Sequence, residues 1–96
     1  MKKQLLIEKY IEPSEVKVYS NYAYERWFDK YGNRHSIMGQ PSYTRYYKGE
    51  IREQLWDKKG IKHRDRDLPA YIDYYNEKTN YQIWFKNGKL IKSSHQ

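Results

Sequence analysis

The sequence predicts an all-β protein: an elongated antiparallel meander, a single sheet thick, built from about three copies of a 28-residue unit. Three observations lead to this prediction. Proline, tryptophan and glycine recur at a common spacing, the segments between them are rich in β-forming residues, and no stretch keeps a helical period over three turns. Short, regularly spaced strands separated by turn residues are typical of β-repeat proteins.

The repeat is visible in the positions of several residue types. The prolines keep a constant step of 28, the tryptophans keep steps of 29 and 28, and three glycines, two histidines and three tyrosines share the step of 28. The recurring residues are Pro13, Pro41 and Pro69; Trp27, Trp56 and Trp84; Gly32, Gly60 and Gly88; His35 and His63; and Tyr19, Tyr47 and Tyr75. We therefore divide a single domain, residues 1–96, into units at about 4–31, 32–59 and 60–87, with 88–96 as a C-terminal cap.

Each unit is expected to contain two strands and a tight turn. The last tryptophan segment, 81–86, is followed by Asn87-Gly88 and residues 89–92, and Asn-Gly between two such runs favours a type I′ hairpin. The other strand of each unit is expected to open with its proline, as at 41–47 and 69–75. Alternation predicts one face with valine, threonine and isoleucine and an opposite face rich in tyrosine. Matched tyrosine and tryptophan rings are expected to stack in ladders across the strands.

The composition predicts a thin core. Hydrophobic residues make up 38% of the chain and the mean hydropathy is −1.24, but aromatic residues reach 18% and twelve of them are tyrosines. Large amphipathic rings would then take the place of a second layer. The chain has no cysteine, and its first eight residues contain only three consecutive apolar residues. We therefore expect no transmembrane segment and a cytoplasmic location.

These residues resemble a known repeat pattern, Trp-Tyr-x-Asn-Gly-x-x-His-Arg-x-Asp-x-Pro-Ala followed by an alternating strand. Over about residues 13–92 the chain is similar to variant MORN-type repeats (membrane occupation and recognition nexus), which occur in phage, giant-virus and some bacterial proteins. The middle unit matches best, through Trp56, Gly60, His63, Arg64, Asp67, Pro69 and Ala70. The first unit has Ser36 where arginine is expected, and the last diverges at Ile91 and Lys92. The resemblance implies a single-layer β-meander, a viral or phage source, an interaction role and no shared catalytic activity.

Enzyme chemistry is not expected. His63-Arg64-Asp65 has the letters of a kinase catalytic loop, but the chain lacks the other kinase motifs, and no Ser-His-Asp or Cys-His arrangement recurs in register. His63, Asp65 and Asp67 would form only part of a metal site. We expect instead that His63 packs on Trp56 and that Arg64 pairs with Asp65 or Asp67. The sequence predicts no cofactor and no metal.

The charge and the aromatic residues indicate a binding surface. The net charge of +7 favours acidic partners, although a solvated lysine-rich surface would have the same charge. The expected partner-binding residues on one sheet face are Tyr43, Arg45, Tyr47, Tyr71 and Tyr75, and those at the turn after Trp56 are Lys58, Lys62, Arg64 and Arg66.

Three interpretations of this surface follow from the sequence. The first is a non-catalytic module that binds an acidic protein. The alternative is sequence-tolerant binding of RNA or single-stranded DNA, with bases on the aromatic rings and phosphates on lysine and arginine. A second alternative is an anionic small ligand or lipid head group held by Lys62 and Arg64. Unpaired strands at the ends of the sheet could also support self-association.

Overall fold

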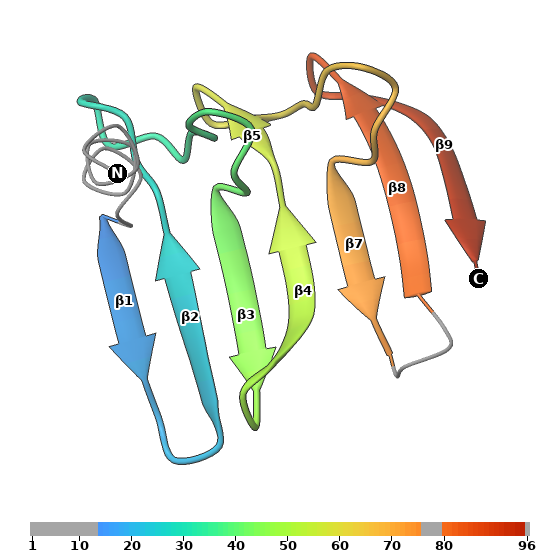
Figure 1. Ribbon diagram of the computed structural model, residues 1–96. Helices are drawn as coiled ribbons and strands as arrows, with labels where there is room; N and C mark the ends of the chain where they lie inside the picture. Colours follow the sequence, from blue (N-terminus) through green and yellow to red (C-terminus); the bar gives the residue numbers. More distant parts are fainter. Residues whose placement is uncertain (1–13, 76–79, 96) are drawn as a thin grey trace, which may run out of the picture.

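The computed structural model describes residues 14–75 and 80–95, with the side chains up to Ser94 (Figure 1). Every regular element in this part is a β-strand, so the prediction of an all-β fold is confirmed. The strands are β1 (Glu15–Val18), β2 (Tyr22–Arg26), β3 (Tyr43–Tyr47), β4 (Glu50–Leu55), β5 (Asp57–Lys58), β6 (Ile61–Lys62), β7 (Tyr71–Tyr74), β8 (Asn80–Lys86) and β9 (Lys89–His95). The expected start of the first unit, with Pro13, and residues 76–79 of the third unit lie outside the described residues.

Seven strands form one antiparallel sheet in the order β1-β2-β3-β4-β7-β8-β9, and β5 pairs with β6 at one end of it (Figure 1). Three hairpin turns contain a lysine or asparagine followed by glycine, both with positive φ: Lys48-Gly49, Lys59-Gly60 and Asn87-Gly88. Two consecutive residues with positive φ match the right-handed twist of paired strands, which explains the glycine in each turn.

The chain can be followed as three stretches, 15–42, 43–70 and 71–95, with a first seam between stretches one and two and a second seam between two and three (Figure 1). Backbone hydrogen bonds across the two seams recur at the same step as the prolines. In the first seam, Gly60 N donates to Arg34 O (2.8 Å) and Ser36 N donates to Asp57 O (2.8 Å). In the second seam, the corresponding bonds run from Gly88 N to Lys62 O (2.8 Å) and from Arg64 N to Phe85 O (3.4 Å). The two seams therefore share one backbone plan.

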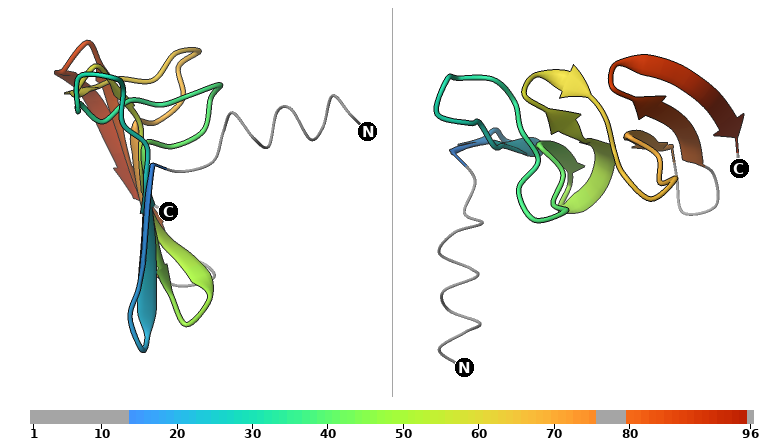
Figure 2. Two further views of the ribbon diagram at one scale, coloured as in Figure 1. Left: turned by 90° about the vertical axis from the view of Figure 1, so that its left-hand side faces the viewer. Right: turned by 90° about the horizontal axis from the view of Figure 1, so that it is seen from above.

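The loops at 35–42 and 63–70 leave the same end of the sheet and project to one side of it (Figure 2). Each loop receives a hydrogen bond from the tryptophan of the next stretch: Trp56 Nε1 donates to Gly39 O at 3.0 Å, and Trp84 Nε1 donates to Asp67 O at 2.8 Å. A buried indole N–H needs such an acceptor, so the loop and the ring hold each other in place.

The apolar core of the described residues is small. Trp56, Ala70 and Ile72 form one buried cluster, against which Tyr74 and Phe85 pack. Phenol and indole groups thus supply much of the apolar area, as expected for a chain of this composition.

Two details differ from the expectations. Pro41 and Pro69 precede strands β3 and β7 by two residues, because a residue without an N–H cannot donate to the ladder. The rings of Trp56 and Trp84 do not stack on each other: each has a cation over it, Arg64 at 3.7 Å and Lys92 at 4.6 Å from the ring centroid. Among the described residues, no helix is long and apolar enough to cross a membrane.

Candidate functional site

One face of the seven-stranded sheet carries most of the tyrosines, and we call it the tyrosine face. Register and alternation place on this face Tyr22 and Tyr24 of β2, Tyr43, Arg45 and Tyr47 of β3, Glu53 and Leu55 of β4, and Tyr71 and Asp73 of β7. Tyr43, Leu55 and Tyr71 lie side by side across three adjacent strands. Four of the five predicted sheet residues are therefore on one surface, and the fifth, Tyr75, directly follows β7.

A stack of rings covers the tyrosine face between β1 and β3. Tyr19 lies 4.6 Å from Tyr22 and 6.2 Å from Tyr24, and Tyr24 lies 6.0 Å from Tyr43, measured between ring centroids. The Arg26 guanidinium carbon lies 4.4 Å from the centre of the Tyr24 ring. These contacting rings are not at the matched positions of the predicted ladder, and Tyr19, Tyr22 and Tyr24 were not among the predicted site residues.

The centre of the tyrosine face is a polar network. Arg45 Nε lies 3.5 Å from Glu53 Oε1, and the Tyr71 hydroxyl donates to Glu53 Oε2 at 2.7 Å. Burial, together with the hydrogen bond to Glu53, raises the pKa of the Tyr71 phenol well above its usual range. Two predicted partner-binding residues, Arg45 and Tyr71, therefore already bind within the sheet, whereas Tyr47 and Tyr75 are 37% and 47% exposed.

The opposite face has matched tyrosine bonds across the two seams. The Tyr46 hydroxyl donates to Glu25 at 2.6 Å in the first seam, and the Tyr74 hydroxyl donates to Gln54 at 2.9 Å in the second. Burial and the bond to Glu25 raise the pKa of Tyr46 to about 12. These phenols connect strands β2 with β3 and β4 with β7, so they stabilise the sheet.

The four predicted basic residues lie beyond the tyrosine face, on the hairpin and loop at the end of β4. Lys58 is in β5, Lys62 is in β6, and Arg64 and Arg66 are in the loop that follows. Lys58 and Arg66 are exposed, while Lys62 lies over the Phe85 ring with its nitrogen 5.9 Å from the ring centroid. The structure therefore divides the predicted site residues between two surfaces.

The expected roles of His63 and Arg64 are exchanged in the structure. Arg64 stacks on Trp56 and donates from Nη1 to Pro69 O at 3.1 Å, and His63 Nε2 bonds to Asp65 Oδ1 at 2.8 Å. The prediction that His63 packs on Trp56 and Arg64 pairs with an aspartate is wrong. The planar guanidinium of Arg64 stacks well on the flat indole of Trp56. The His63 ring is oriented instead by hydrogen bonds at both of its nitrogens.

That second bond is part of a repeated contact. His35 Nδ1 accepts the backbone N–H of Lys59 at 3.0 Å in the first seam, and His63 Nδ1 accepts that of Asn87 at 2.9 Å in the second. Each histidine thus binds the hairpin turn of the following stretch. The hydrogen bond from His63 also lowers the pKa of the Asp65 carboxyl. In-register histidines are explained here as contacts between stretches.

Asp57 is a buried residue that sequence reasoning did not select. Its side chain is 1% exposed, Ser42 Oγ donates to its Oδ2 at 2.5 Å, and Arg34 Nε lies 3.4 Å from the same oxygen. Its Oδ1 is buried and has no hydrogen-bond partner among the described residues. The sequence contained a signal for this residue, because the equivalent position one repeat later is Phe85, and a carboxylate in a ring position requires polar partners.

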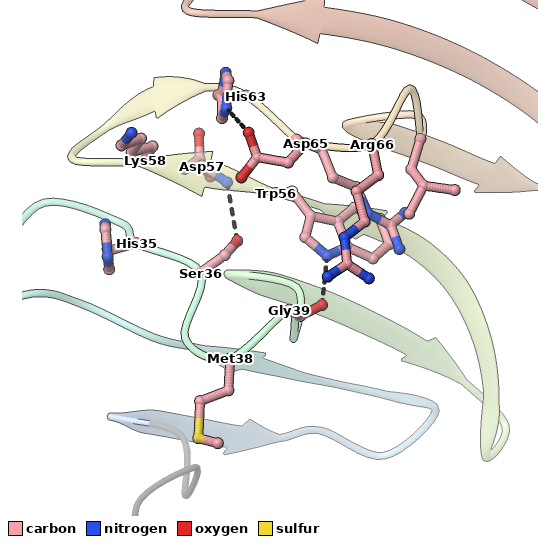
Figure 3. Close-up of a pocket in the computed structure, with 12 residues that line it drawn as sticks. His35, Ser36, Met38, Gly39, Trp56, Asp57, Lys58, His63, Asp65 and Arg66 are labelled. Carbon is pink, nitrogen blue, oxygen red and sulfur yellow. Dashed lines mark hydrogen bonds and ion pairs between the residues drawn. The ribbon is translucent and has the colours of Figure 1, made fainter.

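Two pockets lie at equivalent places in the two seams. The first, of about 490 Å³, lies between the loops that carry Gly39 and Arg66, with Trp56 in its wall (Figure 3). Residues 56–58 and 63–64 line this pocket, and their equivalents 84–86 and 91–92 line the second, of about 600 Å³. The two pockets share a wall, because Arg64, Asp65, Arg66 and Leu68 line both of them. They differ where Phe85 stands at the position equivalent to Asp57 and Ile91 at the position equivalent to His63.

Within residues 14–75 and 80–95, no group of three or more histidine, aspartate or glutamate side chains could hold a metal ion. The chain matches no family model, no curated protein and no solved structure.

Proposed function

We propose that the protein is a non-catalytic interaction module made of about three repeated β units in a single-layer meander, and that its tyrosine face binds an acidic protein. The repeat is supported by the hydrogen bonds that recur in both seams, from the backbone, from Trp56 and Trp84 and to His35 and His63. Repeats that contact only their neighbours give extended surfaces suited to binding. The resemblance to variant MORN-type repeats supports the same interpretation.

The observation that carries the proposal is the run of ring contacts from Tyr19 to Tyr43, one pair stacked and two tilted, with Arg26 over the Tyr24 ring. Tyrosine and arginine are enriched among the residues that contribute most to protein interfaces. Tyr22 and Tyr47 are opposite each other on β2 and β3 and are 41% and 37% exposed. The Lys48 nitrogen and the Arg52 guanidinium carbon lie 5.5 and 5.6 Å from the centroid of the Tyr47 ring, so two positive charges lie beside this exposed ring.

A photo-crosslinking experiment tests this proposal. We expect p-benzoylphenylalanine at position 22 or 47 to crosslink one protein partner in the native host, and the same group at Tyr31 to give none. Tyr31 is a matched control, because it is 77% exposed but lies in the turn after Phe28. Equal products from all three positions, or products that contain only nucleic acid, would contradict the proposal.

Binding of RNA or single-stranded DNA is the second candidate, since a cation beside an exposed ring can hold a phosphate while the ring stacks on a base. Glu53 and Asp73 lie in the middle of the tyrosine face and would repel negative charge from either partner, so they do not separate the two candidates. Filter binding of a 20-nucleotide oligomer at low salt distinguishes the candidates. Retention that falls steeply with salt and is lost in Tyr22→Ser/Tyr47→Ser would favour nucleic acid.

A further inference from the structure

The pocket beside Trp56 is lined by more cations than carboxylates. Lys58, Arg64 and Arg66 line it, and none of the three has an ion pair within 4 Å among the described residues. Two carboxylates also line the pocket. Asp57 binds Ser42 and Arg34 through Oδ2, and Asp65 binds His63 and also interacts with the charge of Lys58. An anion entering the pocket would meet Arg64 and Arg66, which have no ion pair within 4 Å among the described residues.

Arg64 is held ready for such an anion. Its guanidinium carbon lies 3.7 Å from the centre of the Trp56 ring, and one nitrogen donates to Pro69 O, which fixes the plane of the group. Burial lowers the pKa of the Arg64 guanidinium, because its charge is partly removed from water. A bound oxyanion would return the lost solvation through the remaining N–H groups, which form a planar fork.

The rim of the pocket adds apolar contact and backbone strain. Met38 and Leu68 line the rim and are 66% and 42% exposed. Arg66 and Asp67 both have positive φ, 64° and 55°, without a glycine to relieve it. Strain of this kind costs on the order of 1 kcal/mol per residue and is concentrated at ligand sites. A volume of about 490 Å³ is large enough for an organic molecule.

We propose that this pocket binds a small organic oxyanion, with its phosphate or carboxylate group against Arg64, Lys58 and Arg66 and its carbon body against Met38 and Leu68. The site is separate from the tyrosine face and does not require the proposed protein partner. Arg64 and Arg66 also line the second pocket, so the internal comparison depends on the cation over each ring: Arg64 over Trp56 is a planar fork, and Lys92 over Trp84 is a point charge.

The indole N–H signals in ¹⁵N–¹H NMR spectra test the proposal, because the three tryptophans give one signal each and Trp56 borders the pocket. The probes are phenyl phosphate and phenylacetate, which share a ring and differ in the anionic group, with benzyl alcohol as the neutral control and sodium chloride at matched ionic strength. We expect at least one anion to shift the Trp56 signal saturably, before that of Trp84, and benzyl alcohol to leave it unchanged. The anion that saturates at the lower concentration identifies the phosphate or the carboxylate as the preferred group.

Variants make the outcome specific. Arg64→Gln should raise the Kd about tenfold or more, as expected for loss of a charge-assisted contact. Lys58→Gln changes an exposed residue and should raise the Kd a few-fold, so the question can still be answered if Arg64→Gln disturbs the fold. Arg26→Gln, on the tyrosine face, should leave the Kd unchanged, and so should Tyr22→Ser/Tyr47→Ser. Absence of a saturable shift with both anions, or an equal Kd in Arg64→Gln and Lys58→Gln and the parent protein, would overturn the proposal without affecting the tyrosine face.

Discussion

The two seams share a backbone plan but differ in what is buried between the strands. In the first seam the buried residue is Asp57, bonded by Ser42 and Arg34, and at the same position in the second seam Phe85 packs on the apolar cluster around Trp56. The comparison shows that the recurring turn and histidine contacts are compatible with either a carboxylate or a ring. The buried side chain then decides whether a seam depends on polar partners or on apolar area.

The largest expected effect comes from breaking the polar seam. Asp57→Ala should lower the free energy of unfolding by about 3 kcal/mol, because Ser42 and Arg34 lose their buried acceptor and a cavity remains. Urea unfolding measures this change. Asp65→Asn is the control: Asp65 is 82% exposed in the loop after β6, and this variant should unfold close to the parent protein. If Asp57→Ala unfolds at the same urea concentration as the parent, the first seam does not depend on its carboxylate.

The equivalent turn glycines allow a direct comparison of the seams. Gly60 and Gly88 have φ of 84° and 82°, so alanine at either position should cost about 1 kcal/mol from backbone strain alone. A Cβ at Gly88 would also lie 2.8 Å from Ile61 Cγ2, whereas at Gly60 the nearest atom is Asn33 Oδ1 at 3.4 Å. We therefore expect Gly88→Ala to lose about 1 kcal/mol more than Gly60→Ala in thermal or urea unfolding.

Two further variants check the cause of that difference. Gly49 has a φ of 82°, and a Cβ added there would have no atom within 4 Å, so Gly49→Ala measures the cost of backbone strain alone. Ile61→Ala in the Gly88→Ala background should recover the additional loss, because it removes the crowded methyl group. An equal loss of unfolding free energy in Gly60→Ala and Gly88→Ala would mean that Ile61 moves away from the added methyl group at little cost.

The smallest expected effect is the dependence of stability on alkaline pH. The pKa of Tyr46 is raised to about 12, above the usual value of about 10, so the unfolded chain releases this proton first as the pH rises. Stability is therefore lost progressively between about pH 10 and 12. Tyr46→Phe should make this fall shallower, measured as the melting temperature against pH. Tyr74→Phe, at the equivalent position, should change the slope less, because Arg64 opposes the rise in the Tyr74 pKa. The same slope in all three proteins would rule out the Tyr46–Glu25 bond as a source of the pH dependence.

The local features of the fold could be predicted from the sequence. Asn87-Gly88 lies in the hairpin expected between residues 81–86 and 89–92, now strands β8 and β9. The alternation at 43–47 and 71–74 predicts that Tyr43 and Tyr71 share a face, and the register places them on one row. These predictions succeed because a strand has a side-chain period of two and a type I′ turn accepts few residue types.

The side-chain partners could not be predicted in the same way. His63 and Arg64 were expected to bind within their own stretch. Arg64 does so, over Trp56 rather than at an aspartate, but His63 also binds the Asn87 amide of the next stretch. Asp57 meets Ser42 and Arg34, which both belong to the preceding stretch of the chain. No local pattern in the sequence contains these pairings.

The sequence by itself determined the β class, the turns and the face on which each strand residue lies, because these depend on backbone geometry over a few neighbouring residues. The tertiary structure alone decided which polar groups meet at the seams and which cations remain without an acid. The reason is that these contacts join a loop of one stretch to the hairpin turn of the next, which are distant along the chain. Whether a buried histidine, arginine or aspartate finds a hydrogen-bond partner therefore depends on residues of the neighbouring stretch.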